Sequence, residues 1–229
     1  MTRETLAAAA VALRTGGTAV FPTDTVYGLG VSVEAAESPA VLYRLKGRDE
    51  GKPISWLVGG PEALSRYGAD VPAWAFALAK AFWPGPLTLV VRASTTVPAA
   101  FASAAGTIGL RMPASEAALA LIRQVGCPLA TTSANFSGLP APGTFNQVDP
   151  VLLAKVDAAV PEGDAKAGCG AHGAAAAVSG TSAASALAAA PASGVASTVV
   201  DCTGQAPIIL REGDITETQI RAACRAVGR

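Results

Sequence analysis

Two short polar segments of the sequence hold side chains that could bind a phosphate group. Lys46 and Arg48 flank a single glycine. Ser133 and Asn135 flank a single alanine. On an extended backbone, residues i and i+2 point to the same face, so each pair would present its side chains together. Two cations, a hydroxyl and an amide suit an anion with several oxygens. The four side chains predict a nucleotide phosphate site, although the two cations taken alone would also fit a solvated surface pair.

A further candidate is an arginine within an apolar stretch. Arg111 follows Ile108, Gly109 and Leu110. A buried arginine is rare unless it is paired or faces a site. No acidic partner is evident nearby in the sequence, so a carboxylate ligand is one interpretation and an ion pair within the protein is the other.

Hydroxyl groups also gather at two predicted strand ends. Residues 22–30 read Pro-Thr-Asp-Thr-Val-Tyr-Gly-Leu-Gly, and residues 131–138 read Thr-Thr-Ser-Ala-Asn-Phe-Ser-Gly. Strand ends are where α/β folds commonly bind ligands. The alternatives are a capped turn with glycines for the first segment and a helix N-cap for the second.

These side chains must be positioned by the elements that flank them. Apolar runs and turn signals predict strands and helices that alternate irregularly, so we expect an α/β fold with a twisted mixed sheet flanked by helices. Residues 83–88, Trp-Pro-Gly-Pro-Leu-Thr, are interpreted as a structural helix-to-strand turn. The predicted strands are 18–21, 26–33, 54–58, 87–92, 107–112, 128–132, a short one near 158, 197–201 and 208–211. The predicted helices are 2–14, 38–45, 72–82, 115–125, 148–153 and 216–227.

The composition argues against several classes of protein and site. With 17 basic and 17 acidic residues, the chain lacks the excess of Lys and Arg that a dedicated nucleic-acid coat needs. Four cysteines without a Cys-x-x-Cys pair fit a reduced cytoplasmic protein. No run of about 20 apolar residues predicts a membrane span. The single histidine, His172, argues against a His-dependent triad or a His-rich metal site.

One segment differs from the rest of the chain. We expect a single domain over residues 1–229, with a low-complexity insertion at about 167–194, where 22 of 28 residues are Ala, Gly or Ser. Such a segment has little side-chain volume to bury, which favours a flexible insertion. The alternative is an Ala-rich helix over 182–190 that acts as a lid.

Several of these segments together resemble the YrdC/Sua5/YciO family, and within it the threonylcarbamoyl-AMP synthases. They follow the family order from about residue 6 to residue 225. The matching pieces are 22–30, 46–48 with 52–53, 82–88, 108–113, 133–138, 196–201 and 209–213. The absence of a separate C-terminal Sua5 domain would make this the short form.

The resemblance implies both a fold and a reaction. The fold would be a twisted α/β sheet with a concave, positively lined cleft. The reaction would use ATP, with Mg2+, together with L-threonine and bicarbonate or CO2, and would yield threonylcarbamoyl-AMP and pyrophosphate. Partner threonylcarbamoyl-transferase proteins would then modify position 37 of tRNA, with at most a weak tRNA contact by this chain.

The resemblance also implies roles for single residues. A catalytic tetrad that also binds ATP would consist of Lys46, Arg48, Ser133 and Asn135, and two more ATP contacts would be Thr107 and Arg211. L-threonine would contact Thr23, Arg111, Thr131 and Ser197. No side chain is expected to be a metal ligand. Three positions depart from the family pattern, namely Asp49, Ala141 and Ala196.

Two other functions compete with the synthase. One is a non-catalytic RNA-binding protein like the YciO branch, against which zero net charge and the intact Ser-x-Asn pair argue. The other is a carbamoyl-transfer enzyme with another acceptor, although such domains usually accompany further catalytic domains.

Overall fold

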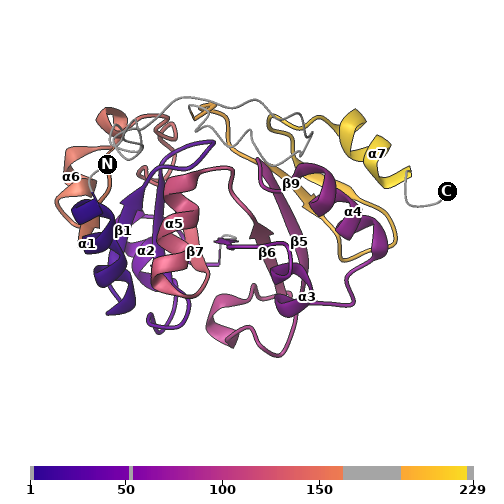
Figure 1. The fold of residues 1–229 in the computed structure, drawn as a ribbon, viewed down its shortest axis with the longest axis horizontal. Coiled ribbons are helices and arrows are strands. Elements are labelled where there is room, and N and C mark those ends of the chain that lie inside the picture. The colour runs from indigo at the N-terminus through magenta and orange to yellow at the C-terminus, as the bar shows by residue number, and fades with distance from the viewer. Residues whose placement is uncertain (1–2, 52–53, 162–191, 226–229) are drawn as a thin grey trace, which may run out of the picture.

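The computed structural model describes residues 3–51, 54–161 and 192–225 (Figure 1). The strands are β1 (Thr18–Phe21), β2 (Gly28–Ser32), β3 (Ser55–Leu57), β4 (Gly68–Ala69), β5 (Leu87–Ala93), β6 (Thr107–Arg111), β7 (Leu129–Ser133), β8 (Ala158–Ala159), β9 (Thr198–Asp201) and β10 (Ile208–Arg211). The α-helices are α1 (Arg3–Arg14), α2 (Ala40–Lys46), α3 (Ala63–Tyr67), α4 (Ala73–Phe82), α5 (Glu116–Val125), α6 (Pro150–Leu153) and α7 (Glu217–Arg225). Two 3-10 helices are η1 (Ala99–Phe101) and η2 (Phe145–Gln147).

The strands form one mixed sheet, as the sequence predicts. Its order is β10-β9-β5-β6-β3-β7-β2-β1-β8, and β4 pairs with β5. The pairs β1–β8, β3–β6 and β5–β9 are parallel, and the other pairs are antiparallel. The irregular alternation of helices and strands therefore gives a mixed sheet rather than a regular doubly wound one.

Two apolar clusters lie against this sheet. One joins Phe21, Leu57 and Leu129 to α1 and α5, which pack on each other beside β1 and β7 (Figure 1). The larger cluster joins the strands to α2, α3, α4 and α7, and Figure 1 shows α4 and α7 beside β5 and β9. Trp56 belongs to the larger cluster and Leu57 to the smaller one, because successive residues of a strand point to opposite faces.

The same alternation places polar residues next to core residues in the central strands. Trp56, Leu89 and Leu110 are fully buried in the larger cluster. Their sequence neighbours Ser55 and Thr88 line a cavity on the other face of the sheet. The cavity floor is thus made by the strands themselves.

Most predicted elements are confirmed, and the ends of most differ by one or two residues. The second strand was expected from residue 26 but starts at Gly28, because the Thr23 hydroxyl ties Thr25 and Val26 into a turn. The short elements α3 and β4 were not predicted, since five and two residues are too few for a clear periodic pattern. Only residues 192–194 of the low-complexity segment at 167–194 lie within the described residues, and His172 lies outside them. Within the described residues, no helix is long and apolar enough to span a membrane.

Candidate functional site

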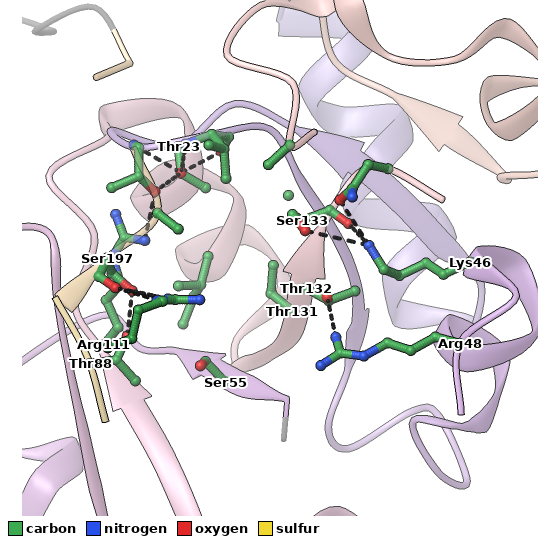
Figure 2. A pocket seen from close by; sticks show the side chains of 18 of the residues that line it. Thr23, Lys46, Arg48, Ser55, Thr88, Arg111, Thr131, Thr132, Ser133 and Ser197 are labelled. Atoms are coloured by element: carbon green, nitrogen blue, oxygen red, sulfur yellow. Dashed lines mark hydrogen bonds between the residues drawn. The ribbon is translucent and has the colours of Figure 1, made fainter. Parts of the chain in front are cut away.

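A cavity of about 380 Å3 brings together nine of the ten predicted site residues. They are Thr23, Lys46, Arg48, Arg111, Thr131, Ser133, Asn135, Ser197 and Arg211. Figure 2 shows labelled lining residues in two groups that face each other. Lys46, Arg48, Thr132 and Ser133 lie on one side, whereas Thr23, Thr88, Arg111 and Ser197 lie on the other.

Lys46 and Arg48 reach the cavity from a helix end, and the expectation of an extended backbone here was wrong. Lys46 is the last residue of α2, and Gly47 has a left-handed φ of 58°. That conformation suits glycine and lets the chain leave the helix, with the Arg48 N–H donating to the Tyr43 carbonyl at 2.9 Å. Both cations line the cavity because the helix ends there, not because of a strand's alternation.

Lys46 is buried and is held by the Ser-x-Asn segment. Its Nζ donates to Asn135 Oδ1 at 3.0 Å, to Ser133 Oγ at 3.4 Å and to the Ser133 carbonyl. Only 3% of the residue is exposed. Burial, followed by the nearby Arg48, lowers the pKa of Lys46 to about 8. A lysine in this state gains from an anion, which would restore its usual affinity for the proton.

Both the oxygen and the nitrogen of the Asn135 amide form hydrogen bonds within the protein. Oδ1 accepts from Lys46, and Nδ2 donates to the carbonyls of Phe136 and Leu139 at 3.0 and 2.6 Å. It therefore aims Lys46 and shapes the loop that follows. In this structure its direct role is to position the lysine.

Arg48 faces the same end of the cavity from the loop that follows α2. Its Nη1 donates to Thr132 Oγ1 at 3.0 Å. Thr132 was not singled out from the sequence, although it stands between the predicted Thr131 and Ser133. Its hydroxyl fixes one arm of the guanidinium over the cavity (Figure 2).

Arg111 lies on the opposite side of the cavity and forms an ion pair with an acidic residue. Its Nη2 lies 2.5 Å from Asp24 Oδ1, and both side chains are almost fully buried. Nη1 donates to Thr25 Oγ1 at 2.8 Å and Nε to the Gly85 carbonyl at 3.2 Å. Burial lowers the pKa of Arg111, and Asp24 opposes part of that effect. The two interpretations of this arginine are thus compatible, because it is paired and it also lines the cavity.

The loop before β2 is a tightly bonded turn that also lines the cavity. Thr23 Oγ1 donates to the Val26 carbonyl at 2.6 Å and accepts from the Thr25 and Val26 N–H groups. The hydroxyl proton of Thr23 and both lone pairs of its oxygen are therefore used within the turn, although the residue lines the cavity. The capped-turn and ligand-contact interpretations are again not exclusive.

Ser197 is clamped between two neighbours. Its hydroxyl lies 2.9 Å from Thr88 Oγ1, and Arg211 donates to its carbonyl through Nε and Nη2 at 3.0 and 2.8 Å. Burial lowers the pKa of Arg211. Thr88 lines the cavity as well, although residues 83–88 were interpreted from the sequence as a mostly structural turn. The turn itself is structural, because Trp83 is buried and its Nε1 donates to the Leu87 carbonyl at 2.8 Å.

Thr131 forms the middle of the cavity floor. It lies across from Gly30 in β2 and from Ser55 in β3. A Cβ atom at Gly30 would stand 3.0 Å from Thr131 Oγ1, and one at Gly28 only 2.9 Å from Thr131 Cγ2. The glycines of β2 therefore make room for this threonine.

Thr107 is the one predicted site residue outside this cavity. Its hydroxyl lies 2.7 Å from Ser103 Oγ, and it lines a second cavity of about 860 Å3. The two cavities share Arg48, Ser55, Thr88 and Arg211, so they adjoin. Ala141 and Ala196, two departures from the family pattern, line the smaller cavity.

The chemistry of the smaller cavity is that of an anion site. Four cations and many hydroxyls line it, and no acidic side chain is among its described lining residues. No group of three or more His, Cys, Asp or Glu residues that could hold a metal ion occurs in the described parts of the chain. The arrangement can orient phosphate and carboxylate oxygens.

Comparison with known proteins gives consistent matches. The family model Sua5_yciO_yrdC, described as telomere recombination, matches residues 11–171. The chain is 33% identical to the threonylcarbamoyl-AMP synthase of Pyrococcus abyssi over 91% of its length, covering 54% of that protein. It is also 33% identical to the Bacillus subtilis threonylcarbamoyl-AMP synthase over 95% of its length, covering 56% of that protein. The crystal structure of P. abyssi Sua5 with L-threonine superposes with a TM-score of 0.79 at 32% identity, over 95% of this chain and 56% of that one. The chain thus spans about half the length of these relatives.

Proposed function

Because this chain belongs to the Sua5_yciO_yrdC family, we propose that it is an L-threonylcarbamoyladenylate synthase, a nucleotidyltransferase. It would form threonylcarbamoyl-AMP and pyrophosphate from L-threonine, ATP and bicarbonate or CO2. Two relatives that bear this activity in their names support the proposal.

The observation that carries the proposal is the two-sided cavity. Lys46 and Arg48 line it from one side and Arg111 from the other. A phosphate on the first side and an amino-acid carboxylate on the second would bring two small reactants into one space. Holding reactants in contact can supply a large part of a rate enhancement without a protein nucleophile.

The proposed chemistry needs alignment more than acid–base groups. The threonine amine adds to CO2 and loses a proton, which gives a carbamate. A carbamate oxygen then attacks the α-phosphorus of ATP, and pyrophosphate leaves with the bonding electron pair. The protein's part is to align these groups and to offset the phosphate charge.

On this proposal, ATP lies along the adjoining cavities. Lys46 and Arg48 neutralise its phosphates, Ser133 offers a hydroxyl, and Asn135 holds the lysine. Arg211 borders both cavities, and Thr107 would contact ATP from the larger one. The cations of the lining support a positively lined cleft.

L-threonine would occupy the other side. Its carboxylate would meet Arg111, while Thr23, Thr131 and Ser197 would contact the rest of the molecule. The P. abyssi structure with L-threonine supports this choice of amino acid.

Mg2+ would enter with ATP. The smaller cavity offers hydroxyl and amide oxygens but no carboxylate among its described lining residues, whereas Glu50 and Asp201 line the larger one. Mg2+ is commonly bound through substrate phosphates together with one or two carboxylates. The downstream partners would be threonylcarbamoyl-transferase proteins acting on tRNA. The substrates occur together in the cytoplasm, where we expect the protein to act.

Pyrophosphate release tests the proposal. The purified chain should release pyrophosphate only when ATP, Mg2+, L-threonine and bicarbonate are all present. L-serine should be a poorer substrate, because losing one methyl contact typically costs about 1 to 3 kcal/mol. Arg111→Ala should weaken L-threonine binding far more than ATP binding in calorimetric titrations. Equal pyrophosphate release without threonine would refute the synthase, and RNA binding without turnover would favour a YciO-like role.

A further inference from the structure

Asp24 stands directly behind the proposed amino-acid site but does not line it. Its Oδ1 accepts from Arg111 Nη2 at 2.5 Å, and 6% of its side chain is exposed. Its other oxygen, Oδ2, is buried without a hydrogen-bond partner in the described structure. The carboxylate is therefore directed at the arginine rather than shared among several groups of the fold.

This arrangement is poorly suited to stabilising the fold. A buried ion pair gains little or nothing over well-packed apolar residues, because both charges lose their hydration. A buried oxygen without a hydrogen bond adds a further cost. A role at the site gives a reason to keep such a pair.

Counting donors indicates what that role is. A guanidinium carries five N–H bonds. In Arg111 three of them have acceptors in the described structure, namely Asp24 Oδ1, Thr25 Oγ1 and the Gly85 carbonyl. Two N–H bonds remain, one on each terminal nitrogen, which is the number that a two-oxygen contact with a carboxylate uses.

The acceptors themselves are fixed in place. The Asp24 carbonyl accepts from the Ser193 N–H at 3.1 Å, and the Thr25 carbonyl accepts from the Gly194 N–H at 2.8 Å. The Gly85 N–H donates to the Met112 carbonyl at 2.8 Å, one residue beyond Arg111. The guanidinium is thus held by groups on two separate segments, residues 24–25 and Gly85.

We propose that Asp24 is a positioning residue that acts through Arg111, fixing the guanidinium so that its two remaining N–H bonds meet the carboxylate of the amino-acid substrate. The proposal rests on the proposed function. The role proposed for Asp24 is geometric, namely to hold the guanidinium in place, rather than a direct effect of its charge on the ligand.

Two substitutions separate geometry from charge. Asp24→Asn removes the charge but keeps an oxygen acceptor at the same distance. Asp24→Glu keeps the charge but pushes the acceptor outward by one methylene. Asp157→Asn is a matched control, since Asp157 accepts from the Thr18 N–H and hydroxyl at 2.8 and 2.9 Å and does not line either cavity.

The assay is pyrophosphate release by the full chain, with KM measured separately for L-threonine and ATP. We expect Asp24→Asn to raise the threonine KM by less than about threefold and Asp24→Glu by more than about tenfold. The ATP KM should stay within about twofold in both variants, and Asp157→Asn should change neither constant. If Asp24→Glu does not fold, Asp24→Ser, which is too short to reach Nη2, should behave as Asp24→Glu.

The opposite order, with Asp24→Asn worse than Asp24→Glu, would overturn the proposal in favour of a charge effect. Equal changes in both KM values, or no change in the threonine KM, would overturn it in favour of a structural role. Failure of the proposed function is recognised separately, because the unmodified chain would then release no threonine-dependent pyrophosphate. Calorimetric titration with L-threonine and with L-threoninamide, which lacks the carboxylate, reports on Arg111 without turnover.

Discussion

Binding of ATP should draw a proton onto Lys46. In the free protein, burial and Arg48 lower the pKa of this lysine to about 8, and no carboxylate lines its cavity among the described residues. A phosphate beside Nζ favours the charged form and should return the pKa toward its usual value of about 10.4. The complex then holds more protons than the free protein, so affinity must fall as pH rises through 8.

The expected amounts follow from these two pKa values. With a pKa of about 8 in the free protein and about 10.4 in the complex, binding takes up about 0.1 proton at pH 7, about 0.5 at pH 8 and about 0.9 at pH 9. The apparent affinity for ATP should be about tenfold weaker at pH 9 than at pH 7. The phosphate groups of ATP titrate near pH 6 and contribute little above pH 8.

Calorimetry in buffers of different ionisation enthalpy measures this uptake directly. The matched variant is Lys46→Arg, whose guanidinium stays charged throughout the range and should show almost no uptake at pH 8. An uptake at pH 8 that is equal in the two proteins would assign the proton to another group. An unmodified protein with no uptake at pH 8 would refute the reasoning about burial.

Three further predictions concern neighbouring side chains. Asn135→Asp places a carboxylate beside Lys46 Nζ, so the pKa of the lysine should rise and the proton uptake at pH 8 should shrink in the same calorimetric assay. Arg48→Lys should lose about as much kcat/KM as Arg48→Ala, roughly 2 to 4 kcal/mol, because a lysine cannot bind phosphate and Thr132 through one rigid plane; near-normal turnover in either variant would assign Arg48 to a surface role. Thr88→Val keeps the shape but removes the bond to Ser197, so denaturant unfolding should show a loss of about 1 to 3 kcal/mol, and an unchanged stability would mean that the serine finds another partner.

Much of the site could be predicted because its residues stand in short, unusual segments. Ser133 and Asn135 follow a predicted strand, and Arg111 ends another. Polar and charged side chains next to apolar runs stand out in the sequence. The strands were predicted from apolar runs bounded by glycine and proline. These are local signals, whereas Thr107, Ser197 and Arg211 were expected only from the resemblance to the family. The structure places nine of the ten expected residues around one cavity.

What the sequence could not supply were partners that are distant along the chain. Asp24 and Arg111 are 87 residues apart, and Thr88 and Ser197 are 109 apart. No pattern in one sequence links such positions. The extended backbone assumed for Lys46 was wrong for a similar reason, since the end of α2 is set by Gly47 rather than by a strand pattern.

Along the central strands, residues that face the cavity alternate with residues that face the core. This alternation limits where residues can be inserted or deleted. In β3 and β5, Ser55 and Thr88 face the cavity while Trp56 and Leu89 fill the core behind them. A single inserted residue at the start of either strand would exchange the two faces, burying hydroxyls and turning the apolar side chains into the cleft. Two inserted residues would restore the facing but move every group by about 7 Å along the sheet. Redesign of this cleft for another amino acid is therefore a matter of substitution within the strands, with changes of length confined to the loops between them.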